Sequence, residues 1–224
     1  MIGIVYKNAD FVVVNKPIGI PSQADNNGGD DAMKQTAEAL AALGEKGNLH
    51  IINRLDTVVS GLVLFARNPA SAAALTELLS GGITKEYRAV CEGVPGDGVM
   101  KDFLVKEAAL GRAIVASPTK KGAKEAELHH FTLETVEYKG KKLSLVRVIL
   151  KTGRFHQIRA QFSSRKMPLV GDKKYGSRDF LARTPALFAA RLAFDFKGEK
   201  YDFKISPDTS AYPWCLFNEE NFSR

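Results

Sequence analysis

Cysteine is scarce in this chain, with Cys91 and Cys215 as the two examples among 224 residues. So few thiols exclude a disulfide framework and a cysteine-rich zinc site. The sequence also has no apolar run that approaches the roughly 18 residues a membrane-spanning helix needs. We therefore expect a protein of the cytoplasm, where both thiols stay reduced, with no membrane partner.

Histidine is rare as well, with four residues, of which His129 and His130 are neighbours. Adjacent residues on a strand point to opposite faces of the sheet, so this pair predicts no shared metal ion. The stretch from Met1 to Lys16 lacks the basic-then-apolar order of a secretion signal. The sequence therefore offers neither a metal cluster nor an export signal.

Acidic residues are outnumbered by basic ones, 25 against 32, and the formal net charge is +7. The excess is concentrated from Lys139 to Lys174, where 11 Lys and Arg residues accompany one acid, Asp172. That segment alone is more positive than the whole chain, so the remainder is net acidic. Phosphate backbones bind to such patches, whereas the alternative is a solvated surface that serves solubility. We favour nucleic acid as the partner because the segment also holds the most unusual motif in the chain.

Short β-branched runs dominate the pattern, with few helical segments between them. We expect strands at residues 11–14, 62–66, 87–91, 128–136, 143–150, 192–196 and 201–205. Apolar residues at helical spacing predict helices from Asp30 or Asp31 to Leu43, from a Ser71 cap to Leu79, and from Phe155 to Ser163. The prediction is an α+β fold with a mixed, mostly antiparallel sheet and flanking helices.

Polar residues from Asn53 to Gly61 stand between two apolar stretches, and Asp56 is the one acid among them. Polar groups between buried elements need partners, because unpaired ones cost on the order of a few kcal/mol. A structural turn, in which Asp56 accepts backbone N–H groups, explains the segment as well as a catalytic carboxylate does. This segment by itself therefore leaves both interpretations open.

The segment 152–159, Thr-Gly-Arg-Phe-His-Gln-Ile-Arg, opens a predicted helix, and a helix N-terminus favours anions. Arg154 and His156 are expected to face solvent or a bound anion. Arg159 follows an apolar residue of the helix, so it is expected to be partly buried and to need a carboxylate or phosphate partner. Asp56 is a candidate partner, and the pairing would keep that carboxylate ionised. A purely structural ion pair of Arg159 is the alternative.

Tyr87 enters a predicted strand within the segment 84–90. Its ring can stack on a nucleobase, which contributes roughly 1–3 kcal/mol per stacked base. Core packing with a hydrogen-bonded hydroxyl is the alternative for a tyrosine on a strand.

Taken in order, these motifs resemble those of the RluA-type pseudouridine synthases over nearly the whole chain. An opening strand and Lys-Pro-x-Gly turn, an Arg-Leu-Asp motif, a tyrosine strand and a final Arg-rich stretch follow one another as in that family. The matching residues are Phe11–Gly19, Arg54–Asp56 with Ser60-Gly61, Lys85–Ala89, Gly153–Arg159, Pro168–Asp172 and Tyr175-Gly176. The resemblance implies a pseudouridine synthase fold with a central RNA-binding cleft, in a single catalytic domain of residues 1–224 without an S4 domain.

The implied activity is the isomerisation of a specific uridine in structured ribosomal or transfer RNA to pseudouridine. This reaction needs neither a metal nor an organic cofactor. The resemblance implies that Asp56 is the essential carboxylate, as nucleophile or as the base that starts elimination, with Arg159 as its salt-bridge partner. Tyr87 is implied to stack on the uracil and to help remove the C5 proton. The target base must leave the stack to be reached, so base flipping is expected, at a cost of a few kcal/mol.

RNA is the one partner implied, the protein being a monomer without protein partners. Arg54 would contact phosphate or fill the space that the flipped uridine leaves, and the other basic and polar residues would hold the RNA backbone. The full set of expected RNA-binding residues is Arg54, Lys151, Arg154, His156, Gln157, Arg165, Lys166, Lys173 and Lys174. Two residues depart from the family pattern, since Asn53 and Phe188 stand where the family commonly has His.

Two alternatives compete with this prediction. A non-catalytic RNA-binding protein of the same fold explains the basic segment and the aromatics, but gives no reason for the acid in the Arg-Leu-Asp motif. A glycosidase needs a second carboxylic acid at a defined separation from the first. Glu86 is the nearest candidate by motif, yet as the neighbour of Tyr87 on a strand it is expected to point to the opposite face.

Overall fold

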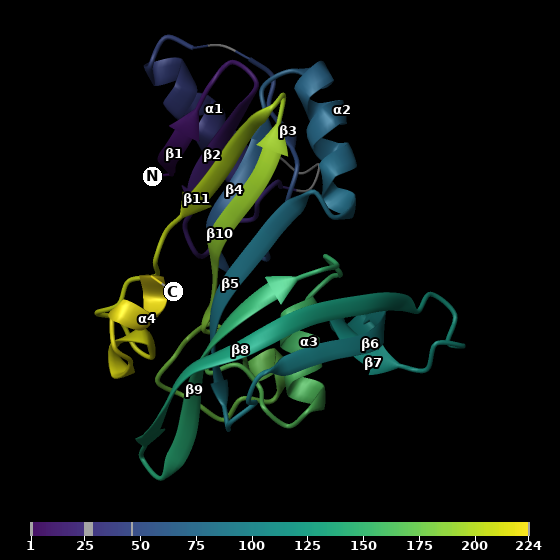
Figure 1. Ribbon diagram of the computed structural model, residues 1–224, viewed down its shortest axis with the longest axis vertical. Helices are drawn as coiled ribbons and strands as arrows, with labels where there is room; N and C mark the ends of the chain where they lie inside the picture. The colour runs from purple at the N-terminus through teal and green to yellow at the C-terminus, as the bar shows by residue number, and fades with distance from the viewer. Residues whose placement is uncertain (1, 25–28, 46, 224) are drawn as a thin grey trace. The chain divides into compact units, whose positions relative to one another are not determined.

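The computed structural model describes residues 2–24, 29–45 and 47–223, and they pack as two compact units. Unit 1 combines Met1–Ile83 with Ala189–Ile205, and unit 2 combines Thr84–Phe188 with Ser206–Arg224 (Figure 1). Each unit therefore joins segments that are far apart in the sequence. The single catalytic domain expected for residues 1–224 stays a prediction.

Unit 1 is a sheet of mostly antiparallel strands with two helices. Its elements are β1 (Gly3–Lys7), β2 (Phe11–Lys16), α1 (Ala32–Ala42), β3 (His50–Ile51), β4 (Ser60–Ala66), α2 (Pro69–Glu77), β10 (Leu187–Phe196) and β11 (Glu199–Lys204). The strand order is β1-β2-β4-β10, with β3 paired to β4 and β11 paired to β10. Helix α2 lies against β3 and β4 (Figure 1).

Capping side chains decide where the two helices of unit 1 begin. The carboxylate of Asp31 accepts a hydrogen bond from the N–H of Lys34, so α1 begins where the sequence predicted. The predicted cap of α2 was wrong: Asn68 is the N-cap, and its side chain accepts from the N–H of Ser71. Pro69 follows Asn68, and proline favours the first helical position because its φ already suits the helix.

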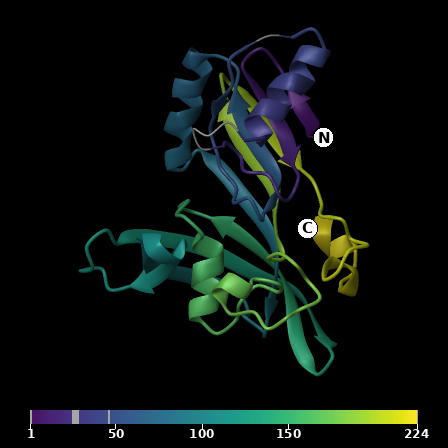
Figure 2. The ribbon, with the colours of Figure 1, turned by 180° about the vertical axis from the view of Figure 1, so that it is seen from behind.

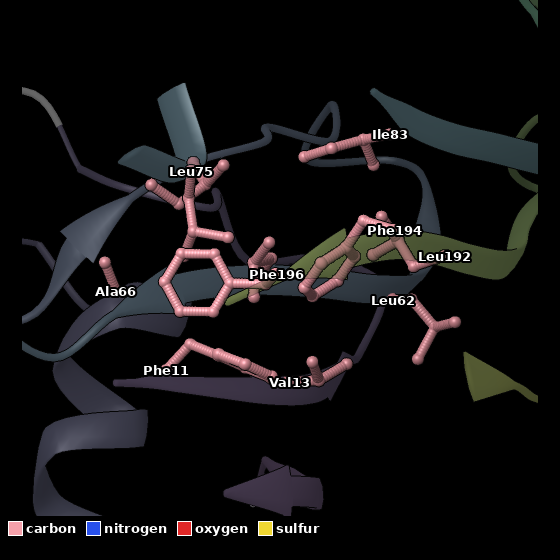
Figure 3. Close-up of a cluster of buried hydrophobic side chains, with 11 residues drawn as sticks. Phe11, Val13, Leu62, Ala66, Leu75, Ile83, Leu192, Phe194 and Phe196 are labelled. Carbon is pink, nitrogen blue, oxygen red and sulfur yellow. The ribbon is translucent and has the colours of Figure 1, made fainter. Parts of the chain in front are cut away.

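An aromatic cluster forms the core of unit 1 (Figure 3). The ring of Phe11 on β2 packs edge to face against Phe194, Phe196 and Tyr201, with centroid distances from 4.9 to 6.0 Å. Leu75 of α2 is fully buried on the same core. Strand β2 is buried along both faces, which explains why its sequence is a continuous apolar run rather than an alternating one.

Unit 2 is a second antiparallel set of strands. Its elements are β5 (Ile83–Glu92), β6 (Gly98–Glu107), β7 (Arg112–Ala116), β8 (Lys124–Tyr138), β9 (Lys141–Leu150), α3 (Gln157–Ser164) and α4 (Glu220–Ser223). The strand order is β5-β9-β8-β6-β7, and its pairings are antiparallel. Helix α3 lies against β6 and β7 (Figure 2).

The α+β class with a mostly antiparallel sheet is confirmed. Every predicted strand lies within or overlaps an observed one, whereas β1, β3, β6 and β7 were not predicted. The helix predicted from Phe155 begins instead at Gln157, because His156 adopts a left-handed conformation with φ of 51° that no α-helix continues through. The predicted RNA-binding cleft stays a prediction.

Candidate active site

The Arg-Leu-Asp loop of unit 1 is held from two sides. Asn53 is buried, its side-chain oxygen accepts from the N–H of Leu64 at 2.7 Å, and its amide group donates to the carbonyl of Leu62 at 3.3 Å. The hydroxyl of Ser22 donates to the carbonyl of Leu55 and accepts from its N–H, at 3.0 and 2.8 Å. Asn53 therefore ties the loop to β4 by its amide, which gives a physical role to the residue that departs from the family pattern.

The second motif, the Lys-Pro-x-Gly turn, is bonded directly to this loop. The N–H of Gly19 donates to the carbonyl of Thr57 at 2.9 Å, and the N–H of Val59 donates to the carbonyl of Asp56 at 3.0 Å. Arg54 is exposed on the loop, and the side chain of Asp56 is half-buried. The fold thus presents an arginine and a carboxylate on a backbone that hydrogen bonds hold in place.

Lys16 is a residue of this site that sequence reasoning quoted within a motif but did not single out. Its side chain is fully buried, and its ammonium group donates to the carbonyls of Pro17 and Ile20 at 2.9 and 2.8 Å. Burial lowers the pKa of Lys16 to about 8, while the negative charge of Asp56 acts in the opposite direction. Lys16 therefore holds the turn closed and places a positive charge within electrostatic reach of Asp56.

A pH-dependent stability follows from Lys16. Its pKa is about 8 in the folded protein, lower than the usual lysine value of 10.5. The unfolded chain therefore binds more protons between these values, and folding stability contributed by this group rises with pH across that window. We expect the unfolding free energy of wild type to rise relative to Lys16→Met by about 1 to 3 kcal/mol from pH 8 to pH 10. Urea unfolding at several pH values measures it, with Lys200→Met, an exposed lysine of β11, as control. Parallel pH curves for wild type and Lys16→Met would contradict the assignment.

Tyr87 lies on β5 in unit 2, where 7% of the residue is exposed. Its neighbours Glu86 and Arg88 are also buried, and they form an ion pair in which the guanidinium donates at 2.5 Å. Residues one apart on a strand point to opposite faces, so Glu86 and Tyr87 do not share a face. The engagement of Glu86 with Arg88 weakens the glycosidase alternative, which needed Glu86 as a second acid.

Arg159 is buried on α3, and Asp172 is the acid that holds it within unit 2. The two side chains form a bidentate pair, with Nε to Oδ2 at 2.7 Å and Nη2 to Oδ1 at 2.9 Å. The Arg159 guanidinium also lies 5.0 Å from the centroid of the Tyr175 ring. Sequence reasoning missed Asp172 as a partner, although its being the single acid in the basic segment was the available signal. The pairing of Arg159 with Asp56 stays a prediction, since Asp56 belongs to unit 1.

The expected RNA-binding side chains differ in how available they are. Exposed ones are Arg54 in unit 1 and, in unit 2, Lys151, Arg154, Lys166, Lys173 and Lys174. Gln157 is buried. Its side-chain oxygen accepts from the hydroxyl of Thr152 and from the N–H of Arg154, and its amide group donates to the backbone carbonyl of Glu127. The RNA contact predicted for Gln157 is untested, but the structure gives its amide an internal role at the start of α3.

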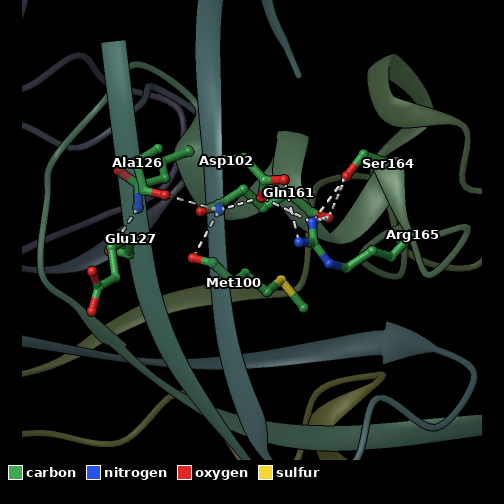
Figure 4. A network of polar contacts seen from close by, with 8 residues as sticks. Met100, Asp102, Ala126, Glu127, Gln161, Ser164 and Arg165 are labelled. Atoms are coloured by element: carbon green, nitrogen blue, oxygen red, sulfur yellow. Dashed lines mark hydrogen bonds and ion pairs between the residues drawn. The ribbon is translucent and has the colours of Figure 1, made fainter. Parts of the chain in front are cut away.

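Arg165 takes part in a network of polar contacts between α3 and the sheet (Figure 4). Its guanidinium donates to Asp102 of β6 at 2.9 Å. The amide of the buried Gln161 donates to the same carboxylate at 2.7 Å and to the carbonyls of Met100 and Ala126. The contacts of Arg165 thus tie α3 to the sheet, and an RNA contact would have to use the part of its guanidinium that stays exposed.

No grouping of three or more His, Cys, Asp or Glu able to hold a metal ion exists among the described residues. Within the same part of the chain, no helix is both long and apolar enough to cross a bilayer. Unit 1 contributes a carboxylate and two cations, from Asp56, Lys16 and Arg54, and unit 2 contributes a cation and a tyrosine, from Arg159 and Tyr87.

Comparisons with known proteins bear on this geometry. The sequence profile of the family described as RNA pseudouridylate synthase matches residues 10–164. A ribosomal large subunit pseudouridine synthase D of Zymomonas mobilis is 28% identical over 217 residues, covering 89% of this chain and 67% of that protein. An uncharacterized RNA pseudouridine synthase of the same organism is 34% identical over 180 residues, covering 78% of each chain. Both relatives thus align with most of this chain.

A solved structure agrees in fold. Human RNA Pseudouridylate Synthase Domain Containing 4 superposes with a TM-score of 0.74 over 92% of this chain and 89% of its own, at 23% identity. This chain therefore belongs to the RNA pseudouridylate synthase family, which makes it an isomerase acting on RNA. Within that family it is of the RluA type, as the motifs from Phe11 to Gly176 predicted.

Proposed function

We propose that this protein converts a uridine of large-subunit ribosomal RNA to pseudouridine, with Asp56 as the essential carboxylate. The substrate assignment is supported by the similarity to the Zymomonas relative, a ribosomal large subunit pseudouridine synthase D. The observation that carries the role of Asp56 is its loop: Asn53, Ser22 and Gly19 hold the backbone on both sides, and a buried lysine supplies positive charge. Such pre-organisation is what a catalytic carboxylate needs.

The proposed reaction is balanced without any added group. The N1–C1′ bond of the target uridine breaks, the uracil turns, and C5 forms the new bond to C1′. The proton on C5 is lost and N1 ends protonated. Asp56 starts this sequence as nucleophile at C1′ or as the base that begins elimination, with Arg159 proposed as its salt-bridge partner. Tyr87 stacks on the uracil and assists the departure of the C5 proton.

A base within a helical stack is out of reach of Asp56, so the uridine must flip out, at a cost of a few kcal/mol. Arg54 is exposed beside Asp56 on the same loop, where its guanidinium can fill the space left by the base or bind a flanking phosphate. The exposed cations of unit 2 bind the backbone. We also propose a cytoplasmic location, with which the free thiols of the buried Cys91 and the exposed Cys215 agree, and a monomer that works without protein partners.

Mapping pseudouridine in total RNA from cells with and without the gene tests this function. We expect one or a few pseudouridines of large-subunit ribosomal RNA to disappear without the gene and to return on complementation. A lost site in transfer RNA instead would contradict the substrate while keeping the reaction. An unchanged map would favour the non-catalytic RNA-binding alternative, and so would failure of 5-fluorouridine RNA to form a stable adduct with the purified protein.

The exposed lysines of unit 2 give a prediction for binding. We expect Lys166→Glu combined with Lys173→Glu to weaken RNA binding by about tenfold or more at low salt, and to lower the salt slope by about 2. Fluorescence anisotropy with a ribosomal RNA transcript measures both. The rate at saturating RNA is expected to fall much less than affinity does. Lys34→Glu with Lys200→Glu, on exposed positions of unit 1, controls for net charge. Equal losses in the two double variants would show that total charge, rather than this surface, governs binding.

A further inference from the structure

Two aromatic side chains at the start of α3 form a stack that the proposed reaction leaves unused. The rings of Phe155 and His156 lie 3.8 Å apart between centroids, with planes 18° from parallel. Phe155 is 41% exposed, although a phenyl ring normally contributes to a core. His156 reaches the stack through a left-handed backbone with φ of 51°, a conformation that costs free energy in any residue other than glycine. The fold therefore maintains this ring pair, with Phe155 exposed and His156 half-buried, at an energetic cost.

The stack is supported by a ring of contacts that runs from His156 through Tyr175, β7 and β6 back to Phe155. His156 Nδ1 is hydrogen-bonded to the hydroxyl of Tyr175 at 3.0 Å, and that hydroxyl accepts from the N–H of Ala113 at 2.7 Å. Ala113 on β7 pairs with Lys106 on β6, and the ammonium group of Lys106 lies 4.8 Å from the centroid of the Phe155 ring. Phe155 is thus bracketed by the imidazole of His156 and by a lysine on an exposed strand position.

The surroundings of the stack are cationic. The ammonium group of Lys174 donates to the carbonyl of Gly111 at 3.1 Å, just before β7. Among the described residues, neither Lys106 nor Lys174 forms an ion pair, whereas the nearby acid Glu107 is paired with Arg112 at 2.9 Å. Unpaired cations beside an exposed aromatic ring are the combination that single-stranded nucleic acid binds, by phosphate contacts and by base stacking.

The stack also lies close to a predicted catalytic side chain. The hydroxyl of Tyr175 is hydrogen-bonded to His156, and the guanidinium of Arg159 lies 5.0 Å from the centroid of the Tyr175 ring. Two side chains therefore separate Phe155 from Arg159 within unit 2. Tyr87 lies on β5 and Phe155 in the turn before α3, so we take a base on Phe155 to be a nucleotide different from the one flipped onto Tyr87.

We propose that the Phe155–His156 stack is a docking platform for an unpaired nucleobase that flanks the target uridine, with Lys106 and Lys174 binding its phosphates. This proposal rests on the proposed function, since it takes RNA as the substrate. When a base arrives, the flexible lysine over the Phe155 ring moves from the π-face to a phosphate, so the ring exchanges a cation contact for a stacking contact. The platform then selects RNA in which a neighbour of the target is unstacked.

Binding of a fluorescein-labelled decauridylate to Phe155→Ala, followed by anisotropy, tests the platform. We expect the dissociation constant to rise about tenfold, which corresponds to about 1.4 kcal/mol. Phe155→Tyr keeps the ring and is expected to stay within about twofold of wild type. The matched control is Phe180→Ala: this ring is 80% exposed and has the ammonium group of Lys173 5.7 Å from its centroid, but, unlike Phe155, it has no second ring stacked on it among the described residues. This control is expected to bind like wild type.

Each outcome supports or overturns the platform. Wild-type affinity in Phe155→Ala overturns it, and so do equal losses in Phe155→Ala and Phe180→Ala, which would show that any exposed ring contributes alike. Loss in Phe155→Ala that Phe155→Tyr does not restore also overturns it, because the ring itself would not be the cause. Pseudouridine mapping in cells with and without the gene separates this test from the proposed function: an unchanged map together with a selective loss of binding in Phe155→Ala leaves the platform standing and removes the enzyme.

Discussion

Replacing Asp56 by Asn is expected to reduce pseudouridine formation by at least about 100-fold, whichever of the two roles the carboxylate takes. Removing a positioned base costs about 10²- to 10⁴-fold, and removing a nucleophile costs more. The amide has nearly the same shape as the carboxylate but neither its charge nor its basicity. Tritium release from RNA labelled at C5 of uridine measures the rate in a single turnover with enzyme in excess.

The control for this variant is Asp195→Asn, which makes the same chemical change at an exposed position of β10 in unit 1. It is expected to keep the wild-type rate. Thermal unfolding of both variants shows whether the chain still folds. Tritium release by Asp56→Asn at the wild-type rate, in a folded protein, would remove Asp56 from the mechanism and return its loop to the structural-turn interpretation.

Replacing Gly61 by Ala is expected to destabilise the protein by about 3 kcal/mol or more. Gly61 begins β4 with φ of +119°, and a Cβ there would lie 2.3 Å from the carbonyl oxygen and 2.6 Å from the nitrogen of Ala189. The left-handed conformation costs about 1 to 3 kcal/mol in other residues, and the clash with backbone adds about 1 to 3 kcal/mol. For a chain of this size the melting temperature is expected to fall by about 6 °C or more.

Gly198→Ala separates these two causes. Gly198 also has a positive φ, +82°, but its Cβ would meet nothing within 4 Å. This variant is expected to cost about 1 to 2 kcal/mol, the conformational part alone. Differential scanning calorimetry compares the two proteins. Equal costs would show that the backbone of β10 can move away from Gly61, and that the close approach does not require glycine.

The alternation of short apolar runs was enough to predict the antiparallel α+β class, because burial on one or both faces leaves a direct mark on each strand. Strands β6 and β7 were not predicted because their residues are less buried than those of the predicted strands. Their residues are mostly half-exposed or exposed, with Lys101 and Lys106 exposed, so burial leaves a weaker mark on their sequences. The α2 cap was misassigned because Asn68 and Ser71 are both capable caps, and only the backbone of Asn68 is extended.

From sequence alone, the order of the motifs predicted the family, which the comparisons show, whereas the catalytic residues carried over from that family stay a prediction. Contacts between distant segments were beyond that reasoning. The pairing of Arg159 with Asp172 and the bond from Gly19 to Thr57 depend on how strands and helices pack. The stack beside Lys106 joins β6, β7 and the turn before α3. Spacing along a chain does not encode distance across a sheet, so only the tertiary structure decided which side chains meet.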